Sequence, residues 1–167
     1  MTEPGPAIAI LTVSDRVAKG ERDDRGGDAL AERAGAAGFP VVARLVVPDE
    51  RAAIETALRD LAGRAAIVLT TGGTGLGPRD VTPEATRAVL DREAPGIAEA
   101  LRAASLAITP FAMLSRAAAG LIGKVLVVNL PGNPKAVGEV WVVLEPVLRH
   151  AVETAAGPVA DETHRHR

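Results

Sequence analysis

AAIVLTTGGTGLGPRD, residues 65–80, is the stretch of this chain that predicts its fold. A short apolar run, residues 65–69, leads directly into a loop of threonines and glycines that ends at Asp80. The residues Thr82-Pro83-Glu84 then combine a capping hydroxyl, a proline for the first turn and an acid near the positive helix end. The stretch therefore predicts a strand, a glycine loop and a helix in direct succession.

The same pattern recurs outward from this stretch in both directions. The apolar runs AIAILTV (7–13), VVARLVV (41–47) and KVLVV (124–128) are each followed by a short polar loop. Helical patterns are expected over 28–37, 50–61, from 82, over 95–106 and from 133, with a β-hairpin over 116–128 that turns at Gly123-Lys124. Such alternation predicts βαβ units around a mostly parallel sheet with a small β-hairpin, which places all four loops at one carboxyl edge.

Size and composition limit the kinds of protein and partner. A chain of 167 residues fits one domain, expected over 7–156, with loose termini at 1–6 and 157–167. It has no cysteine, which excludes disulfides and thiolate metal sites. No apolar stretch approaches the roughly 20 residues of a membrane helix, and no secretion signal is visible, so a cytoplasmic location is expected. A net charge of −2 and only three aromatic residues argue against a nucleic-acid partner.

The glycine loop from Thr71 to Gly75 indicates an anion site. Glycines let backbone N–H groups approach a phosphate closely and adopt positive φ angles. The loop lacks the Gly-Lys-Ser/Thr of a Walker motif and the G-x-G-x-x-G of a dinucleotide site. A tight strand–helix turn is the structural alternative.

Two aspartates follow strands at the same predicted edge. A carboxylate such as Asp80 beside a phosphate cradle is unfavourable unless a cation lies between them, and Mg²⁺ commonly takes one or two carboxylates plus phosphate oxygens. We therefore expect Asp80 to bind a metal, the alternatives being an ion pair with Arg79 or a helix cap. Asp49, in Pro48-Asp49-Glu50, has the same two interpretations, metal site or helix start.

The remaining loops add hydroxyl, amide and cationic groups. Ser14 could donate to a phosphate and Arg16 could clamp one, unless they only form a turn. Asn133 and Lys135 stand where a helix begins after a strand, which is either an anion site or a plain cap. Asp24 lies in a charged loop and is expected to be merely solvated.

Together these motifs resemble one known family. SDR (14–16), PDE (48–50), TTGGTGLGPRDVTPEAT (70–86), LSRA (114–117) and NLPGNPKA (129–136) are similar to the molybdopterin adenylyltransferases of molybdenum cofactor biosynthesis, and the match spans about 7–150. The resemblance implies a three-layer α/β/α molybdopterin-binding fold, commonly a homotrimer. It implies a Mg²⁺-dependent transfer of AMP from ATP to the terminal phosphate of molybdopterin, with release of pyrophosphate.

The resemblance also assigns roles to single residues. Asp49 and Asp80 stand at the catalytic, metal-binding aspartates. The phosphate cradle would be Thr71, Gly72, Gly73, Thr74 and Gly75. The other substrate contacts would be Ser14, Asp15, Ser115, Pro131, Gly132, Asn133 and Lys135. A downstream metal-insertion protein is a candidate partner. A non-catalytic molybdopterin-binding paralogue and a nucleotide pyrophosphatase-like relative stay open as alternatives.

Overall fold

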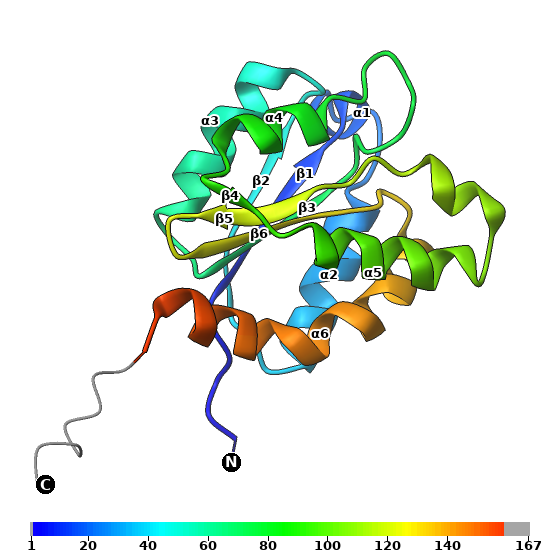
Figure 1. Ribbon diagram of the computed structural model, residues 1–167. Coiled ribbons are helices and arrows are strands. Elements are labelled where there is room, and N and C mark those ends of the chain that lie inside the picture. Colours follow the sequence, from blue (N-terminus) through cyan, green and yellow to red (C-terminus); the bar gives the residue numbers. More distant parts are fainter. Residues whose placement is uncertain (1, 159–167) are drawn as a thin grey trace, which may run out of the picture.

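A six-stranded sheet with helices on both faces makes up the structure, a computed structural model that describes residues 2–158 (Figure 1). The strands lie in the order β2 (Val41–Val47), β1 (Ile8–Val13), β3 (Ile67–Thr71), β6 (Val125–Leu130), β5 (Ala119–Ile122) and β4 (Arg92–Glu93). The first four strands are parallel, and β5 and β4 add an antiparallel edge. The predicted α/β class, with a mostly parallel sheet and a small hairpin, is confirmed.

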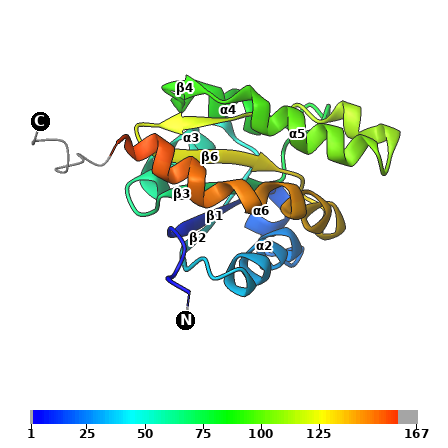
Figure 2. The same ribbon diagram turned by 60° about the horizontal axis from the view of Figure 1, so that its bottom comes forward.

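The helices form one layer on each side of the sheet. Figure 1 shows α3 (Arg51–Ala62) and α4 (Thr82–Val89) on one face, and α2 (Arg25–Ala36), α5 (Pro95–Leu106) and α6 (Pro134–Ala156) on the other. Figure 2 shows α2 and α6 side by side on their face. The short helices α1 (Asp15–Ala18) and η1 (Pro110–Leu114) lie outside these layers. None of the helices within residues 2–158 is long and apolar enough to cross a membrane.

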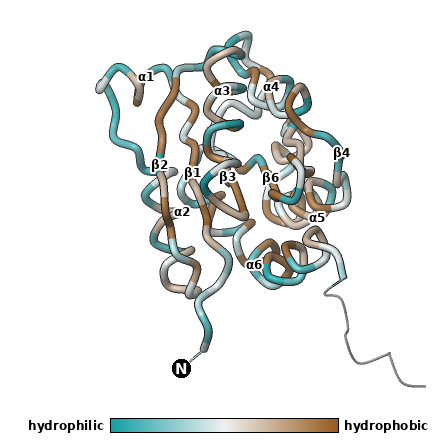
Figure 3. Tube along the Cα trace, turned by 90° about the vertical axis from the view of Figure 1, so that its left-hand side faces the viewer, coloured by the Kyte–Doolittle hydropathy of each residue, from teal (hydrophilic) through white to brown (hydrophobic). Residues whose placement is uncertain are grey.

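Burial explains why the central strands are apolar along their whole length. All residues of β1 and β3 are buried, because helices cover both faces of the sheet there. The edge strand β2 alternates between half-buried and exposed residues instead. One apolar cluster fills the space under α2, α5 and α6, and a second lies under α3 and α4. Figure 3 shows the strands mainly in brown, whereas the helices mix hydrophilic residues in teal with hydrophobic residues in brown.

Three predicted boundaries were wrong by a few residues. Strand β3 covers 67–71 rather than 65–69, because Thr70 and Thr71 pair with both β1 and β6. Helix α2 begins at Arg25 rather than Asp28, since the Asp24 carboxylate accepts from the backbone N–H of Gly27 at 2.9 Å and caps the helix earlier. The hairpin covers 119–130 around its predicted turn, where Gly123 has a φ of +57°.

The two ends of the predicted domain, at residues 7 and 156, differ in their surroundings. In residues 2–6, expected to be loose, no regular element forms, yet Gly5 is buried and its N–H donates to the Gly38 carbonyl at 2.8 Å. Helix α6 ends at Ala156, the expected end of the domain. Most of the predicted loose tail, residues 159–167, lies outside the described residues.

The strand order creates a topological switch point. From β1 the chain moves outward to β2, whereas β3 lies on the other side of β1 and leads toward β6. The loops that leave β1 and β3 therefore diverge at their carboxyl ends, and a crevice opens between them. Ligands of open α/β sheets bind at this position.

Asn129 holds the strands beside this crevice in register. Its buried side chain donates to the hydroxyls of Thr70 (3.0 Å) and Thr86 (2.9 Å) and accepts from the N–H of Ala118 (3.0 Å). It thereby connects β6 to β3, to α4 and to the segment that leads into β5. A buried network of this kind is favourable only while each member has its partner.

Asn129→Leu should lower the free energy of unfolding by about 2–4 kcal/mol, because it leaves the Ala118 N–H without its acceptor and two hydroxyls without their donor. Urea unfolding measures this. Thr86→Val removes only one partner and should cost about 1 kcal/mol. The double variant should be less destabilised than the sum of the two. Full additivity would show that the three bonds do not act as a unit.

Candidate active site

A polar cavity of about 590 Å³ opens at the carboxyl edge of the sheet, at the switch point between β1 and β3. It is bounded by the ends of β1 and β3, the loop after β2, and the segments that lead into α2 and α6. Eight of the residues predicted from the sequence line it: Ser14, Asp49, Thr71, Gly72, Gly73, Asp80, Gly132 and Asn133. The prediction that four separate loops converge on one edge agrees with this geometry.

The glycine loop packs against its neighbours so closely that side chains are excluded. Gly72 and Gly73 have φ angles of +97° and +69°, which favour glycine. A Cβ on Gly72 would lie 2.3 Å from the Val13 carbonyl oxygen, and one on Gly132 would lie 3.3 Å from the Gly72 Cα. Backbone therefore forms the floor of the cavity, as a phosphate cradle requires.

Two long helices begin at the cavity and point their positive ends toward it. Asn133 caps α6 by accepting from the N–H of Lys135 at 2.8 Å, so the capping interpretation of Asn133 holds beside its place in the cavity wall. Asp24 caps α2 in the same way. Gly26, in the first turn of α2, is so close that a Cβ would lie 2.7 Å from the Thr71 hydroxyl oxygen. Paired helix N-termini favour anions at this position.

The start of α2 contributes residues that sequence reasoning missed. Arg22 and Arg25 line the cavity, and their guanidinium groups suit phosphate oxygens. Asp24 also lies in the wall, whereas it was expected to be merely solvated. Its carboxylate accepts from the Thr12 hydroxyl at 2.9 Å and from Arg44 at 3.1 Å in addition to its capping bond, so it is a structural group. The sequence signal that indicates this helix start is an N-cap residue, Asp24, three positions before Gly27.

Asp49 and Asp15 hold two of the loops together by reciprocal hydrogen bonds. The Asp49 carboxylate accepts from the backbone N–H of Asp15 at 2.8 Å, and the Asp15 carboxylate accepts from that of Asp49 at 3.0 Å. Asp49 is therefore not the cap of α3, whose N-cap residue is Glu50. Burial raises the pKa of Asp49, and the negative charges of Asp15 and Asp80 raise it further.

Asp15 differs from Asp49 because it has its own cation. Arg79 forms a bidentate ion pair with the Asp15 carboxylate, with both N–O distances at 3.0 Å. This pair, followed by the bond from Asp49, lowers the pKa of Asp15. Among residues 2–158, no arginine, lysine or histidine forms an ion pair with Asp49 or Asp80.

Asp80 also lacks the partners that its structural alternatives would require. Arg79 is engaged with Asp15, and the N-cap of α4 is Val81 with no side-chain cap bond. The Asp80 carboxylate accepts one bond within its own loop, from the Gly77 N–H at 2.9 Å, and lines the cavity. Asp49 and Asp80 thus present carboxylate oxygens with which no cation within residues 2–158 forms an ion pair.

This donor set fits a magnesium ion that arrives with a polyphosphate. In the described part of the chain, no group of three or more His, Cys, Asp or Glu side chains is arranged to hold a metal. A complete protein cage is not what Mg²⁺ uses, since it commonly binds one or two carboxylates, phosphate oxygens and water. Burial is the largest cause of the raised pKa of Asp49, and the negative charges of Asp15 and Asp80, which a bound cation would offset, raise that pKa further.

The other predicted contacts lie outside this cavity. Ser115 and Pro131 line a smaller, more apolar cavity of about 240 Å³, formed by α5, η1 and the start of α6. Thr74 and Gly75 turn their carbonyls toward Arg116. The Lys135 side chain is 83% exposed beside Glu139. Two further residues touch neither cavity: Asp15, which reaches the site through Asp49, and Arg16, the expected phosphate clamp.

The fold and the site define an α/β protein with a polar cavity at a topological switch point, the position at which open α/β sheets bind their ligands. Residues 9–150 match the family described as "probable molybdopterin binding domain", and the chain belongs to this family. The chain is 44% identical over 137 residues to the molybdopterin adenylyltransferase of Escherichia coli (strain K12), covering 79% of this chain and 70% of that protein.

Solved structures agree with this assignment. The molybdopterin biosynthesis enzyme MoaB of Thermus thermophilus has a TM-score of 0.85 and 47% identity, covering 92% of this chain and 98% of that one. A molybdopterin biosynthesis protein of Mycobacterium abscessus has a TM-score of 0.87 and 39% identity, with coverage of 92% and 98%. The predicted molybdopterin-binding fold is thereby confirmed.

Proposed function

We propose that this protein is a molybdopterin adenylyltransferase, which transfers AMP from ATP to the terminal phosphate of molybdopterin and releases pyrophosphate. The observation that carries the proposal is the cavity itself. A backbone cradle at Gly72 and Gly73, two helix N-termini and two carboxylates without an ion-pair partner among residues 2–158 meet at one switch point. The named relatives support the same activity.

The cavity would hold the triphosphate of ATP, and the smaller cavity would hold the pterin. Gly73 and the α6 N-terminus offer backbone N–H groups, while Arg22 and Arg25 offer charge. The Gly72 N–H already donates to the Leu130 carbonyl at 3.2 Å, so Gly72 shapes the cradle rather than donating to the phosphate. Pro131 lies in the wall of the smaller cavity and its neighbour Gly132 in the wall of the larger one. A substrate that extends from one cavity to the other would therefore bring its terminal phosphate to the cradle.

The reaction requires positioning more than proton transfer. An oxygen of the molybdopterin phosphate attacks the α-phosphorus of ATP and forms a phosphoanhydride bond, while the bond to the bridging oxygen breaks and pyrophosphate leaves with the electron pair. The attacking oxygen is already anionic, so no general base is needed. Asp49 and Asp80 would hold Mg²⁺, which when bound neutralises charge on the phosphate oxygens. The cradle and helix ends fix both phosphates in line.

Incubation of the protein with ATP, Mg²⁺ and molybdopterin tests the proposal. The expected products are pyrophosphate and an adenylylated pterin, detected by mass spectrometry. Omission of Mg²⁺ should prevent both. Release of AMP without molybdopterin would identify a pyrophosphatase-like hydrolase instead. Binding of molybdopterin without any pyrophosphate would identify a non-catalytic paralogue.

We also propose that the chain assembles as a homotrimer, the state that the family resemblance implies. Support comes from large apolar side chains that are exposed near the smaller cavity and along α6: Ile108, Met113, Leu114, Val142 and Val147. Both η1 and α6 pack against α5. Exposed apolar surface commonly marks a protein interface. Subunits joined here would meet beside the smaller cavity, which α5, η1 and α6 enclose.

Light scattering should give three times the chain mass of 17.1 kDa. Val142→Glu, at a side chain that is 69% exposed, should shift the protein toward monomers because it places a charge in the proposed interface. Val42→Glu makes the same substitution at an exposed valine on the edge strand β2, outside the proposed interface, and should leave the mass of the assembly unchanged. A monomeric wild-type protein, or dissociation by Val42→Glu alone, would contradict the proposed surface.

A further inference from the structure

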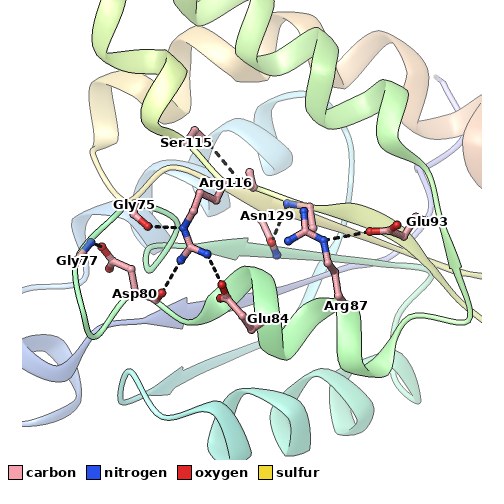
Figure 4. Close-up of polar contacts among 11 residues, drawn as sticks. Gly75, Gly77, Asp80, Glu84, Arg87, Glu93, Ser115, Arg116 and Asn129 are labelled. Carbon is pink, nitrogen blue, oxygen red and sulfur yellow. Dashed lines mark hydrogen bonds and ion pairs between the residues drawn. The ribbon is translucent and has the colours of Figure 1, made fainter.

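Arg116 reaches across the loop that carries Asp80 and binds it at both ends (Figure 4). Its Nε donates to the Gly75 carbonyl at 2.8 Å, and its Nη2 donates to the Asp80 carbonyl at 2.6 Å. Its backbone N–H donates to the Thr74 carbonyl at 2.9 Å. A single residue from a distant part of the chain thus connects the first and last positions of this loop.

The loop has few other ties to the protein. Among residues 2–158, the other side-chain hydrogen bonds between residues 74–80 and the rest of the chain are those of the Arg79 pair with Asp15. The apolar residue of the loop, Leu76, is 65% exposed and so does not anchor it. The bond between the Asp80 carboxylate and the Gly77 N–H is internal. Arg116 is therefore the main restraint on the backbone of Asp80.

Glu84 orients the Arg116 guanidinium toward the loop. It stands in the first turn of α4, directly after the loop, and pairs with Arg116 Nη1. Burial alone would raise the pKa of Glu84, but hydrogen bonds from Arg116 and the backbone outweigh burial and hold that pKa below its ordinary value. The planar guanidinium satisfies two carbonyls and a carboxylate at once, which the point charge of a lysine cannot reproduce.

The segment that carries Arg116 lies between the smaller cavity and the Asp80 loop. Ser115 and Ala117 line the smaller cavity, whereas the Arg116 side chain turns to the Asp80 loop instead. Arg102 of α5 holds this segment by donating to the Ala117 carbonyl at 2.9 Å. Neither cavity is lined by Arg116 itself. Its side chain is therefore placed to hold protein rather than substrate.

We propose that Arg116 is a positioning residue, which keeps the Asp80 carboxylate aimed into the larger cavity by clasping both ends of the 75–80 loop. The proposal rests on the proposed function only for the role of Asp80 toward the metal. The clasp itself concerns this chain alone and can be measured without substrate.

Arg116→Lys is the decisive variant, and Arg87→Lys is its matched control. Arg87 lies on the same helix as Glu84 and pairs with Glu93 at 3.1 Å, close to the Arg116–Glu84 pair in Figure 4 but away from both cavities. Hydrogen exchange of a peptide that covers residues 72–81 should become about tenfold faster in Arg116→Lys, because hydrogen bonds that close the loop are lost. Exchange in α4 should stay unchanged, and Arg87→Lys should match the wild type in both regions.

The metal requirement provides a second readout. In Arg116→Lys, the Mg²⁺ concentration for half-maximal pyrophosphate release should rise about tenfold, with partial recovery of turnover at saturating Mg²⁺, because a loosened Asp80 is a poorer metal ligand. Binding of Mn²⁺ with ATP, followed by electron paramagnetic resonance, should weaken by a similar factor. A residue that only stabilises the fold would lower turnover without changing the metal requirement.

Three outcomes would overturn the proposal. They are wild-type exchange rates over 72–81 in Arg116→Lys, an unchanged Mg²⁺ requirement in an enzyme that turns over, and a loss confined to the KM for molybdopterin, which would make Arg116 a substrate contact. If Arg116→Lys does not fold, Glu84→Gln takes its place. This variant weakens the orienting pair and should accelerate exchange over 72–81 by about threefold, and no acceleration would overturn the clasp.

A wild-type protein without turnover would defeat the proposed function, whereas the exchange experiment would still decide the role of Arg116.

Discussion

Asp80→Asn should lower the rate of adenylyl transfer by about 10²–10³-fold or more while leaving the fold intact. The asparagine carbonyl can still accept from the Gly77 N–H, and Asp80 forms no ion pair among the described residues, so the loop keeps its internal bond. What disappears is negative charge at the wall of the cavity. Single-turnover measurements with ATP, Mg²⁺ and molybdopterin would quantify the loss, and circular dichroism would verify the fold.

Asp91→Asn is the control for this variant. The Asp91 carboxylate also accepts from a glycine N–H, that of Gly123, at 2.6 Å. It does so at the hairpin turn, at the opposite edge of the sheet from the cavity. Asp91→Asn should therefore leave turnover unchanged. Equal activity in Asp80→Asn and the wild type would rule out metal binding by Asp80 and would return this residue to a purely structural role.

The convergence of these aspartates was predictable from sequence because it depends on topology. Each apolar run is followed by its polar loop, and parallel strands place those loops at one edge whatever the details of packing. Asp49, Asp80, Gly73 and Gly132 are all found there. The sequence could not show which group Arg79 would bind, since Asp15 and Arg79 lie 64 positions apart and meet only when two loops fold over each other.

The missed residues lie where local patterns mislead. Gly26 and Gly27 are poor helix formers, so the sequence pattern places the charged segment before them in a loop and assigns no role to Arg22 and Arg25. Both glycines are required there, because a Cβ on Gly26 would crowd Thr71 and the Gly132 carbonyl and one on Gly27 would crowd the Asp24 carboxylate. The sequence pattern places Asn129 at the start of a loop, whereas it belongs to β6 and is buried. Its role becomes visible only when β3, β6 and α4 are in place.

Asp49→Asn should lower activity but raise stability. Turnover should fall by about 10²-fold or more, because a carboxylate that would hold Mg²⁺ is lost. The free energy of unfolding at neutral pH should rise. Burial, together with the charges of Asp15 and Asp80, raises the pKa of Asp49 in the folded protein, so its ionised form is less favourable there than in the unfolded chain. The neutral amide removes that cost and can still accept the hydrogen bond from the Asp15 N–H.

The pH dependence follows from the same sign. A group with a raised folded pKa contributes stability below its unfolded pKa, about 3.9 for an aspartate, and loses that contribution as the pH rises through the folded value. The stability advantage of Asp49→Asn should therefore be full at neutral pH and disappear as Asp49 takes up its proton in acid. Thermal unfolding from pH 7 down to about pH 4 would show this, with Glu50→Gln, an exposed neighbour without a cap bond, as the control. If the Asp49→Asn protein is less stable than the wild type at pH 7, the ionised Asp49 carboxylate stabilises the fold, which would contradict the prediction that it destabilises the fold when no cation is bound.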